Sequence, residues 1–256
     1  MADMQFIRLD TADGVARITL ARPKHNVLDI AMMNELSNAL EALAVDDALK
    51  CVVFGAEGRS WCAGVEVADH QPAMAPDMIA AFNRMLGRIE AMEVPTVAAV
   101  QGACLGGGME AAIACDTIIA SDKAKFGQPE VKLGFFPPYA AIRLPPLIGA
   151  AKTIEICTFG KIYRASEAQA MGFVTHVVAA DDFTEYVDRF IQEIHACSPL
   201  IVRLNKRAVR NHLGLTAEPA VARVSDYFLN TLMKTEDVLE GIASFEEKRQ
   251  PVWKNK

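Results

Sequence analysis

The segment CLGGGMEAAIACD, residues 104–116, places three consecutive glycines directly before an alanine-rich run that favours a helix. Glycine is a poor helix former, but it lets another molecule or chain approach the backbone closely. The first N–H groups of a helix have no acceptor within it, so this position can bind a partial negative charge. The alternative is a tight turn that only lets a strand and a helix pack together.

A second glycine-bearing loop, EGRSWCAGVEVADH at residues 57–70, follows an apolar run that favours a strand. Two strand ends therefore each present a glycine turn at the same edge of a sheet. If backbone N–H groups from both turns point at one oxygen, they form an oxyanion hole, which stabilises negative charge that develops during a reaction. The G-G-G spacing fits neither a P-loop nor a dinucleotide-binding fingerprint.

The elements that must position these loops alternate between strands and helices. VARITLA at 15–21 follows an Asp13-Gly14 turn and predicts a hairpin, and the apolar spacing of residues 29–47 predicts an amphipathic helix with Asp29 as its N-cap. A further helix is expected over 77–93. Three apolar runs predict buried parallel strands: 49–56, 95–103 and 116–121.

The second half of the chain is expected to be mainly helical. Helical patterns occupy residues 145–160, 166–171, 181–212, 216–233 and 236–249, and strand signals fade after about residue 140. No Gly/Ser/Pro-rich linker and no internal repeat separate the halves. The prediction is one α/β core domain over 1–195, with a helical C-terminal region over 196–256 that packs on the core or on a neighbouring subunit.

The composition of the 256-residue chain limits its partners. A net charge of −6 argues against nucleic acid or an anionic membrane as a partner, since both need a basic face. The six cysteines contain no C-x-x-C pair, so neither a metal site nor a disulfide framework is expected. The start of the chain has no signal-peptide pattern, and a cytoplasmic protein in a reducing compartment is expected.

Three segments in order, RSWCAGVEV, AAVQGACLGGGMEAAIACD and AKFGQPEVKLG, resemble the successive signatures of the crotonase or enoyl-CoA hydratase superfamily. The resemblance extends from RPKHNVLD at 22–29 to EGIASFEEKRQPVW at 240–253. It implies a crotonase (ClpP/crotonase-like) fold, in which ββα units repeat and a mainly helical C-terminal region forms trimers. It also implies a hydro-lyase that acts on an acyl-CoA thioester.

By this resemblance the oxyanion hole consists of the backbone N–H groups of Val65 and Gly107. Members that hydrate double bonds use two glutamates, and the matching positions hold Glu110 and Glu130. We expect Glu130 to donate a proton to carbon and Glu110 to orient and deprotonate water. Taken alone, each glutamate would be interpreted as a solvated carboxylate.

The resemblance also assigns residues to CoA, which is part of the substrate and the reason that no separate cofactor is expected. An acidic protein must supply cations locally to bind this polyanion. The alternative for each cation is solvated surface charge. The predicted CoA-binding residues are Arg22, Lys24, Ala63, Val65, Val67 and, reaching a neighbouring subunit, Phe245 and Lys248. A homotrimer or a dimer of trimers is implied.

The segment after the second glutamate departs from ordinary enoyl-CoA hydratases. They continue with a glycine-rich stretch, whereas this chain has VKLGFFPPYAAIRLPP at 131–146. Prolines stiffen the backbone and aromatic rings fill volume, so the pocket should suit a flat ring better than a long straight chain. The predicted acyl pocket consists of His70, Phe135, Phe136, Pro137 and Tyr139.

GFFPP resembles the branch of the superfamily that hydrates cyclohexa-1,5-diene-1-carbonyl-CoA to 6-hydroxycyclohex-1-ene-1-carbonyl-CoA in anaerobic benzoyl-CoA degradation. One alternative is a short-chain or branched 2-enoyl-CoA hydratase. An alternative of another class is a non-catalytic crotonase-like RNA-binding or structural protein. Retention of both Glu110 and Glu130 argues against that class.

Overall fold

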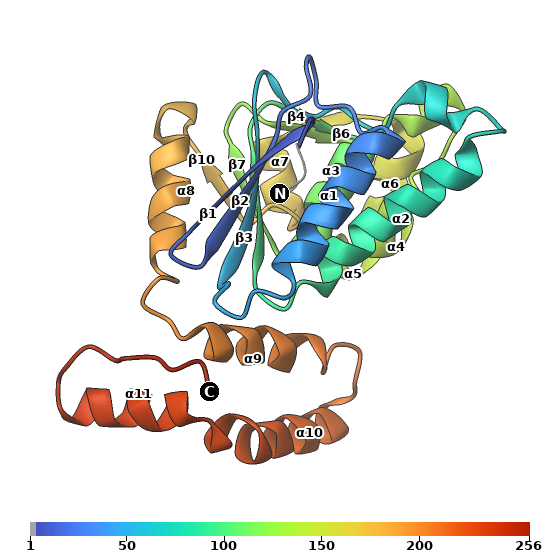
Figure 1. The fold of residues 1–256 in the computed structure, drawn as a ribbon. Coiled ribbons are helices and arrows are strands. Elements are labelled where there is room, and N and C mark those ends of the chain that lie inside the picture. The colour runs from blue at the N-terminus through green and yellow to red at the C-terminus, as the bar shows by residue number, and fades with distance from the viewer. Residues whose placement is uncertain (1–3) are drawn as a thin grey trace.

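The computed structural model describes residues 4–256, which form two β-sheets with helices around them (Figure 1). The ten strands in this range are β1 Ile7–Ala12, β2 Val15–Leu20, β3 Cys51–Ala56, β4 Ser60–Cys62, β5 Thr96–Val100, β6 Ala103–Leu105, β7 Thr117–Ser121, β8 Lys125–Gly127, β9 Ile162–Arg164 and β10 His176–Val178.

The larger sheet has six strands in the order β1-β2-β3-β5-β7-β10. The hairpin predicted around Asp13 and Gly14 is confirmed: β1 and β2 pair antiparallel, with Ile7 opposite Leu20. The other neighbours in this sheet pair parallel, including the three predicted strands β3, β5 and β7. These strands are almost continuously apolar because both faces of the sheet are covered.

The smaller sheet has four strands in the order β4-β6-β8-β9. Each of its first three strands follows a long strand of the larger sheet along the chain, as β4 follows β3, β6 follows β5 and β8 follows β7. The strand predicted over 95–103 is therefore two strands in different sheets. Gly102, with φ of +70°, turns the chain between them, and an added Cβ there would lie 1.9 Å from the carbonyl oxygen of Arg59.

Eleven α-helices lie within residues 4–256, and four 3₁₀ helices accompany them. The α-helices are α1 Ile30–Leu43, α2 Ala75–Ala91, α3 Gly107–Ala114, α4 Ala140–Arg143, α5 Pro145–Ile148, α6 Ala150–Phe159, α7 Ala165–Met171, α8 Phe183–Gln192, α9 Pro199–Arg210, α10 Ala217–Asn230 and α11 Glu236–Glu246. The 3₁₀ helices are η1 Val67–His70, η2 Glu130–Leu133, η3 Ala180–Asp182 and η4 Leu232–Lys234.

Helices cover both faces of the larger sheet. On one face, α1, α2 and α3 contribute to the main apolar core, and on the other α8 packs Phe183, Val187 and Ile191 against the sheet (Figure 1). The N-cap predicted for α1 is confirmed, because the Asp29 carboxylate accepts a hydrogen bond of 2.8 Å from the N–H of Met32. Both faces of the sheet are thus buried, and ligand access is left to its edges.

The second half of the chain differs from the sequence prediction in three places. The helix predicted over 181–212 is two helices, because Ser198 caps α9 and Pro199 occupies its first turn. The helical run over 145–160 is also divided at Gly149, between α5 and α6. The strands β9 and β10 were missed because each has three residues, too few to show an alternating pattern.

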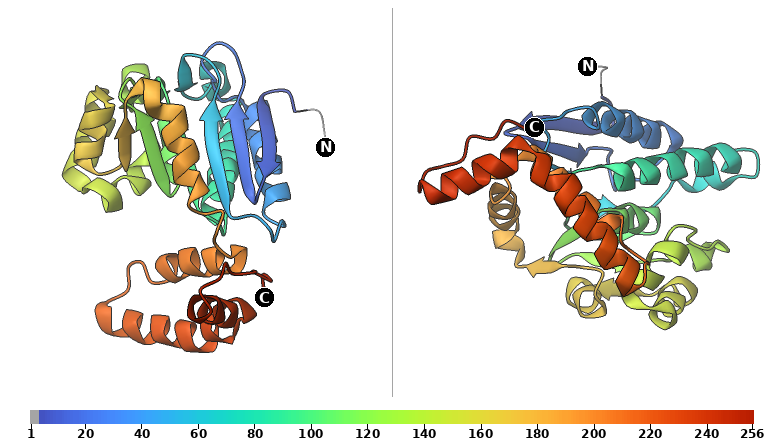
Figure 2. Two further views of the ribbon diagram at one scale, coloured as in Figure 1. Left: turned by 90° about the vertical axis from the view of Figure 1, so that its left-hand side faces the viewer. Right: turned by 90° about the horizontal axis from the view of Figure 1, so that it is seen from below.

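Helices α9, α10 and α11 form a separate layer beyond one end of the sheets (Figures 1 and 2). None of the residues of α10 is buried, and several apolar side chains on this layer are exposed, including Val224, Leu229 and Leu239. Nowhere in residues 4–256 is there a helix with the length and apolarity that crossing a membrane requires.

Candidate active site

The two glycine loops meet where β4 and β6 run side by side. Cys62 in β4 pairs with Cys104 in β6, so the chain segments that follow these strands leave the sheet together. Gly106 donates its N–H to the carbonyl oxygen of Gly127 at 2.9 Å, and helix α3 begins at Gly107. The Gly107 N–H is therefore the first of the helix, and it donates to no other residue within 4–256.

Val65 supplies a second N–H at the same place. The chain around it forms a parallel bridge with Leu28, in which Leu28 donates to Gly64 and Glu66 donates to Leu28. The N–H of Val65 takes no part in this bridge and has no acceptor among residues 4–256. Two unpaired amides at the ends of adjacent strands are the arrangement that an oxyanion hole requires.

The sequence left two roles open for the glycines, an anion site and a tight turn for close packing. Different glycines fit each role. A Cβ on Gly108 would lie 2.4 Å from the carbonyl oxygen of Cys62, so Gly108 lets α3 pack against β4. A Cβ on Gly107 would lie 2.5 Å from Cγ2 of Val65, which shows how close the two candidate amides are. A side chain at Gly107 would displace Val65 and crowd the space that both amides border.

Glu110 lies one turn into α3 and is 2% exposed. Its Oε1 accepts hydrogen bonds from the N–H groups of Tyr139, at 2.7 Å, and Ala140, at 2.8 Å. The pKa of Glu110 is raised to about 7, because burial and, to a smaller extent, the negative charge of Glu130 outweigh the two N–H groups, which lower it. The other carboxylate oxygen is left to act on a ligand.

Glu130 opens η2 and is half-buried. Burial raises the pKa of its carboxyl group to about 7. The side-chain amide of the fully buried Gln128, oriented so that its donors and acceptors are satisfied, donates to Oε1 of Glu130 at 2.9 Å and to Oε2 at 3.1 Å. A Cβ on Gly106 would lie 2.7 Å from Oε1, so the carboxylate is directly beside the glycine loop.

These groups surround one cavity of about 390 Å³. Its lining is mostly apolar, and its titratable members are the two glutamates and one histidine, which suits a largely apolar ligand with one polar centre. The residues that line it are Ala63, Gly64, Val65, Val67, His70, Ala75, Met78, Ile79, Phe82, Gly106, Gly107, Glu110, Pro129, Glu130, Leu133, Gly134, Phe135, Phe136 and Pro138.

The structure brings most of the predicted site residues to this cavity. Val65, Gly107, Glu110 and Glu130 lie together, and Ala63, Val67, His70, Phe135 and Phe136 also line it. Their catalytic and binding roles stay predictions, because geometry alone does not test them.

Pro137 and Tyr139 do not line the cavity, and their predicted place in the acyl pocket is corrected. Both are buried, and the ring of Tyr139 belongs to the main apolar core. The contribution of Tyr139 to the site is its backbone N–H, which binds Glu110. A sequence pattern indicates the chemistry of side chains but not that of backbone groups, and for this reason the Tyr139 ring was predicted to line the pocket.

Sequence reasoning also missed two contributors. Gln128 lies two residues before Glu130, and its place in the GQPE segment was the only signal for it. One face of α2 forms a cavity wall through Ala75, Met78, Ile79 and Phe82. Their spacing of three, four and seven residues marks one side of a helix, but that pattern does not distinguish a core face from a ligand-binding face.

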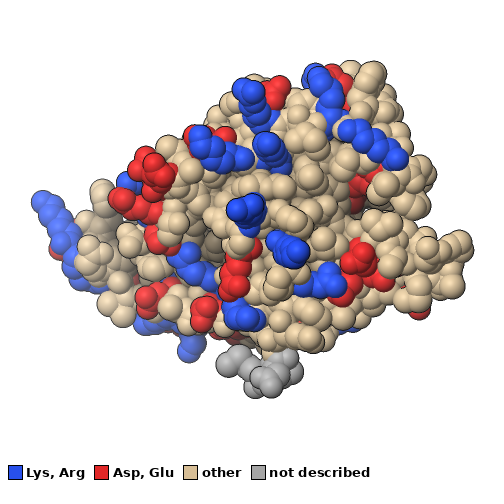
Figure 3. All heavy atoms as spheres, turned by 90° about the horizontal axis from the view of Figure 1, so that it is seen from above, with Lys and Arg blue, Asp and Glu red and all other residues tan. Residues whose placement is uncertain are grey.

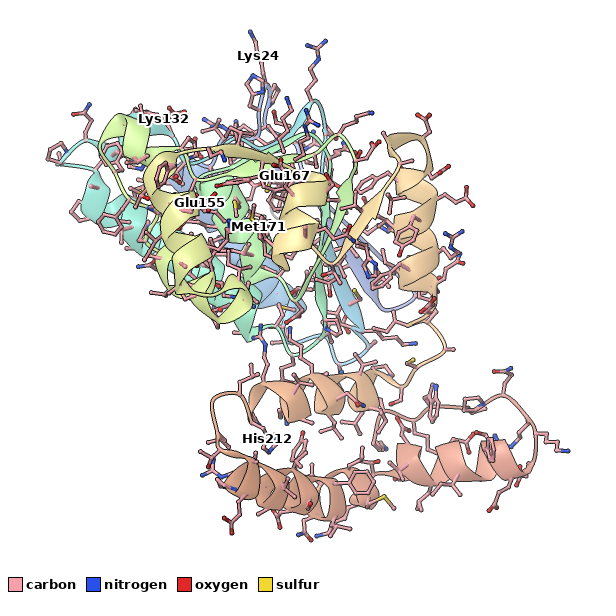
Figure 4. All side chains as sticks on the ribbon, turned by 180° about the vertical axis from the view of Figure 1, so that it is seen from behind. Lys24, Lys132, Glu155, Glu167, Met171 and His212 are labelled. Atoms are coloured by element: carbon pink, nitrogen blue, oxygen red, sulfur yellow. The ribbon has the colours of Figure 1, made fainter. Side chains whose placement is uncertain are left out.

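The predicted CoA-binding cations differ in their surroundings. Arg22 pairs with Asp29 at 2.8 Å and donates to the carbonyl oxygen of Val27, so much of its donor capacity is already used. Lys24 is exposed and projects from the core at the end opposite the C-terminal helices (Figure 4). Lys and Arg side chains are spread over the face seen from above, among patches of Asp and Glu (Figure 3).

Phe245 and Lys248 lie at the end of α11, outside the cavity lining. Phe245 is 85% exposed, and α11 belongs to the layer of helices beyond one end of the sheets (Figure 1). Within a single chain these two residues therefore do not contribute to the site.

The geometry supports acid–base chemistry beside a stabilised oxygen anion. Two carboxyl groups with a pKa near 7 can exchange protons with a substrate at neutral pH, and two free amides can polarise a carbonyl group in the same cavity. Residues 4–256 contain no group of three or more His, Cys, Asp or Glu side chains placed to hold a metal ion.

Two known proteins named as hydratases are similar to this chain over nearly its whole length. The chain is 32% identical over 248 residues to cyclohexa-1,5-dienecarbonyl-CoA hydratase of Thauera aromatica, which covers 97% of this chain and 96% of that protein. It is 36% identical over 248 residues to a probable enoyl-CoA hydratase of Mycobacterium leprae, covering 96% of each.

The fold is also similar to that of solved enoyl-CoA hydratase structures. An enoyl-CoA hydratase from Bacillus anthracis superposes with a TM-score of 0.92 at 29% identity, covering 98% of this chain and 100% of the other. The crotonase fold predicted from the sequence is thereby confirmed. The enoyl-CoA hydratase/isomerase family model matches residues 10–256. The chain therefore belongs to the enoyl-CoA hydratase/isomerase family.

Proposed function

We propose that this protein is an acyl-CoA hydro-lyase that adds water to a conjugated enoyl-CoA or dienoyl-CoA thioester. The observation that carries the proposal is the cavity in which Glu110 and Glu130, each with a pKa raised to about 7, border the unpaired amides of Val65 and Gly107. The relatives named above as hydratases support the same reaction class.

In the proposed mechanism the thioester oxygen accepts hydrogen bonds from the N–H groups of Val65 and Gly107. Water loses a proton to Glu110 as its oxygen bonds to the β-carbon, and electrons of the double bond move toward the thioester. With a simple 2-enoyl-CoA, Glu130 then gives its proton to the α-carbon. With the cyclic diene, the proton goes to the ring carbon at the far end of the diene, so that one double bond stays conjugated with the thioester. Either step completes the addition of one water molecule. The amides stabilise the enolate-like charge because it develops where they already point.

The surroundings of the glutamates support this division of roles. Glu110 accepts two backbone N–H groups on one oxygen, and these favour its charged form, which a base needs. Gln128 donates to both oxygens of Glu130, so it stabilises the carboxylate that remains after Glu130 has given up its proton.

For the CoA portion we propose contacts with Arg22, Lys24 and the backbone at Ala63, Val65 and Val67. Lys24 projects from the end of the core away from the C-terminal helices (Figure 4), and Lys and Arg side chains are spread over the face seen from above (Figure 3). They provide local positive charge on a protein whose net charge is −6. Phe245 and Lys248 would reach the CoA of a neighbouring subunit in a homotrimer or a dimer of trimers, because their place in and just after the last turn of α11 leaves them outside the cavity of their own chain.

For the acyl group we propose cyclohexa-1,5-diene-1-carbonyl-CoA, hydrated to 6-hydroxycyclohex-1-ene-1-carbonyl-CoA as in anaerobic benzoyl-CoA degradation. The aromatic wall formed by Phe135 and Phe136 supports a flat, compact acyl group. The likeness to the Thauera aromatica enzyme, at 32% identity, points in the same direction.

The test is to mix the purified protein with cyclohexa-1,5-diene-1-carbonyl-CoA and, separately, with crotonyl-CoA. Hydration of crotonyl-CoA is followed by the loss of conjugated thioester absorbance, and hydration of the cyclic diene by chromatography of the hydroxylated thioester. We expect turnover of both, with a kcat/KM at least about tenfold higher for the cyclic diene. A clear preference for crotonyl-CoA would overturn the choice of substrate and favour a short-chain enoyl-CoA hydratase. No reaction with either would contradict the hydratase function.

A further inference from the structure

The cavity is bridged by an aromatic contact between two separate chain segments. The rings of His70, from η1, and Phe135, which follows η2, have centroids 4.8 Å apart with planes inclined at 38°. Both residues line the cavity. This separation is within the range of favourable aromatic pairs, so the contact joins one wall of the cavity to another.

Each partner is held by its own segment. The Nδ1 atom of His70 lies 2.9 Å from the carbonyl oxygen of Glu66, within hydrogen-bond distance. The neighbouring Asp69 accepts a hydrogen bond of 3.2 Å from the N–H of Ile30, which attaches η1 to the start of α1. The ring of His70 therefore projects from a segment that is fixed at two points.

Phe135 is positioned relative to the catalytic carboxylate. Its N–H donates to the carbonyl oxygen of Glu130 at 3.0 Å, and Gly134, with φ of +83°, makes the turn between them. Phe135 thus lies one turn beyond Glu130. A thioester whose oxygen is bound at Val65 and Gly107 would extend its acyl group past Glu130 and toward Phe135.

We propose that the His70–Phe135 contact closes the acyl end of the cavity, so that the two residues together set the length of acyl group accepted. This proposal rests on the hydratase function proposed above. A compact ring or a short chain ends before the contact. A long straight chain meets it and is excluded, because separating the two rings loses their packing.

The test compares two substrates in wild type, Phe135→Ala, His70→Ala and the double variant. The quantity measured is the ratio of kcat/KM for trans-2-decenoyl-CoA to that for crotonyl-CoA, or to that for the cyclic diene if crotonyl-CoA is a poor substrate. We expect each single variant to raise this ratio by about tenfold or more. The double variant should gain less than the product of the two effects, because both substitutions remove the same contact.

A matched control is Phe159→Ala, which removes a ring that is 69% exposed at the end of α6 and outside the cavity lining. It should leave the ratio unchanged. Phe135→Leu, which keeps most of the volume, replaces Phe135→Ala if the latter does not fold, and should raise the ratio less than His70→Ala does.

Three outcomes separate the two proposals. If wild type hydrates the short or cyclic thioester and the ratio stays within about twofold in both folded single variants, the length-limiting contact is wrong while the hydratase function stands. Equal kcat/KM values of wild type for trans-2-decenoyl-CoA and crotonyl-CoA would likewise contradict the proposal that the contact limits the length of the acyl group. If wild type hydrates none of the three thioesters, the hydratase function itself fails.

Discussion

Glu110 is an ionisable group placed where water cannot stabilise its charge. It is 2% exposed, and within residues 4–256 only the N–H groups of Tyr139 and Ala140 donate hydrogen bonds that compensate for the lost hydration. The neighbouring Glu130 adds repulsion, because two negative charges in one cavity oppose each other. Both carboxyl groups therefore have a pKa of about 7, so near neutral pH one can act as a base while the other acts as an acid.

This burial predicts a pH-dependent effect of Glu110→Gln on stability. Between the ordinary value of 4.5 and about 7, the folded protein keeps a proton that the unfolded chain releases, so the free energy of unfolding of wild type falls as pH rises. Glutamine has no proton to release, so the free energy of unfolding of the variant does not fall in this way. The variant should therefore gain up to about 3 kcal/mol relative to wild type between about pH 4.5 and pH 8.

Urea unfolding at several pH values measures the difference. Glu218→Gln, at an exposed position on α10, is the control and should parallel wild type throughout. A Glu110→Gln difference that stays constant across the pH range would show that Glu110 is not buried with a raised pKa.

Among the elements, the junction of β4, β6 and α3 is the most constrained. The Gly107 position is close to Val65 and to the ring of Phe82, which lies 3.3 Å from where a Cβ would be. Gly107→Ala should displace Val65 and disturb both amides, with a loss of about 10²- to 10³-fold in kcat.

Gly87→Ala is the matched control for this substitution. Gly87 is inside α2 with no atom within 4 Å of an added Cβ, so alanine there should preserve activity and stabilise the helix by up to about 1 kcal/mol. Steady-state kinetics and thermal unfolding of both variants provide the test. If Gly107→Ala kept full activity, the oxyanion hole would have to lie elsewhere.

The sequence predicted the elements that have strong local signals. Asp29 before an apolar periodicity predicted α1, and continuous apolar runs predicted β3, β5 and β7. The three-residue strands β9 and β10 gave no periodicity, and their place depends on pairing with distant segments.

For the candidate site, too, the sequence predicted residues with a recognisable local motif but not contacts that form only on folding. The recognised segments identified Glu110 and Glu130, and the structure placed both at the cavity that Val65 and Gly107 also line. The role of Gln128 could not be predicted, because its amide meets Glu130 only after the chain has folded. Likewise, the sequence could not show that Tyr139 contributes its backbone and keeps its ring in the core.

At the scale of the whole molecule, a partly buried ion pair joins the C-terminal helices to the core. Lys206 of α9, whose side chain is 8% exposed, contacts Asp116 at 2.5 Å, and Arg210 contacts the same carboxylate at 3.1 Å. Asp116 also accepts hydrogen bonds from the backbone and side chain of Thr96. The end of α3, the start of β5 and helix α9 thus meet at one residue.

Asp116→Ala should therefore destabilise the protein by about 1 to 3 kcal/mol, because it removes the ionic partner of the largely buried Lys206 and an acceptor of the Thr96 N–H. The control is Glu185→Ala, which removes a surface pair with Arg189 at 3.9 Å and should change stability by less than about 0.5 kcal/mol. Chemical denaturation compares them. Equal effects of the two substitutions would show that Asp116 does not anchor the helical layer.

The proposed hydratase function requires that Glu110 and Glu130 together add water to a conjugated thioester. The most direct test is the initial rate of hydration at pH 7 for wild type, Glu110→Gln and Glu130→Gln. The rate is followed as loss of conjugated absorbance with crotonyl-CoA, or as formation of the hydroxylated thioester by chromatography with the cyclic diene. We predict measurable hydration by wild type and a loss of about 10²- to 10⁴-fold in each variant, with folding unchanged. Wild-type rates in either folded variant would contradict the claim.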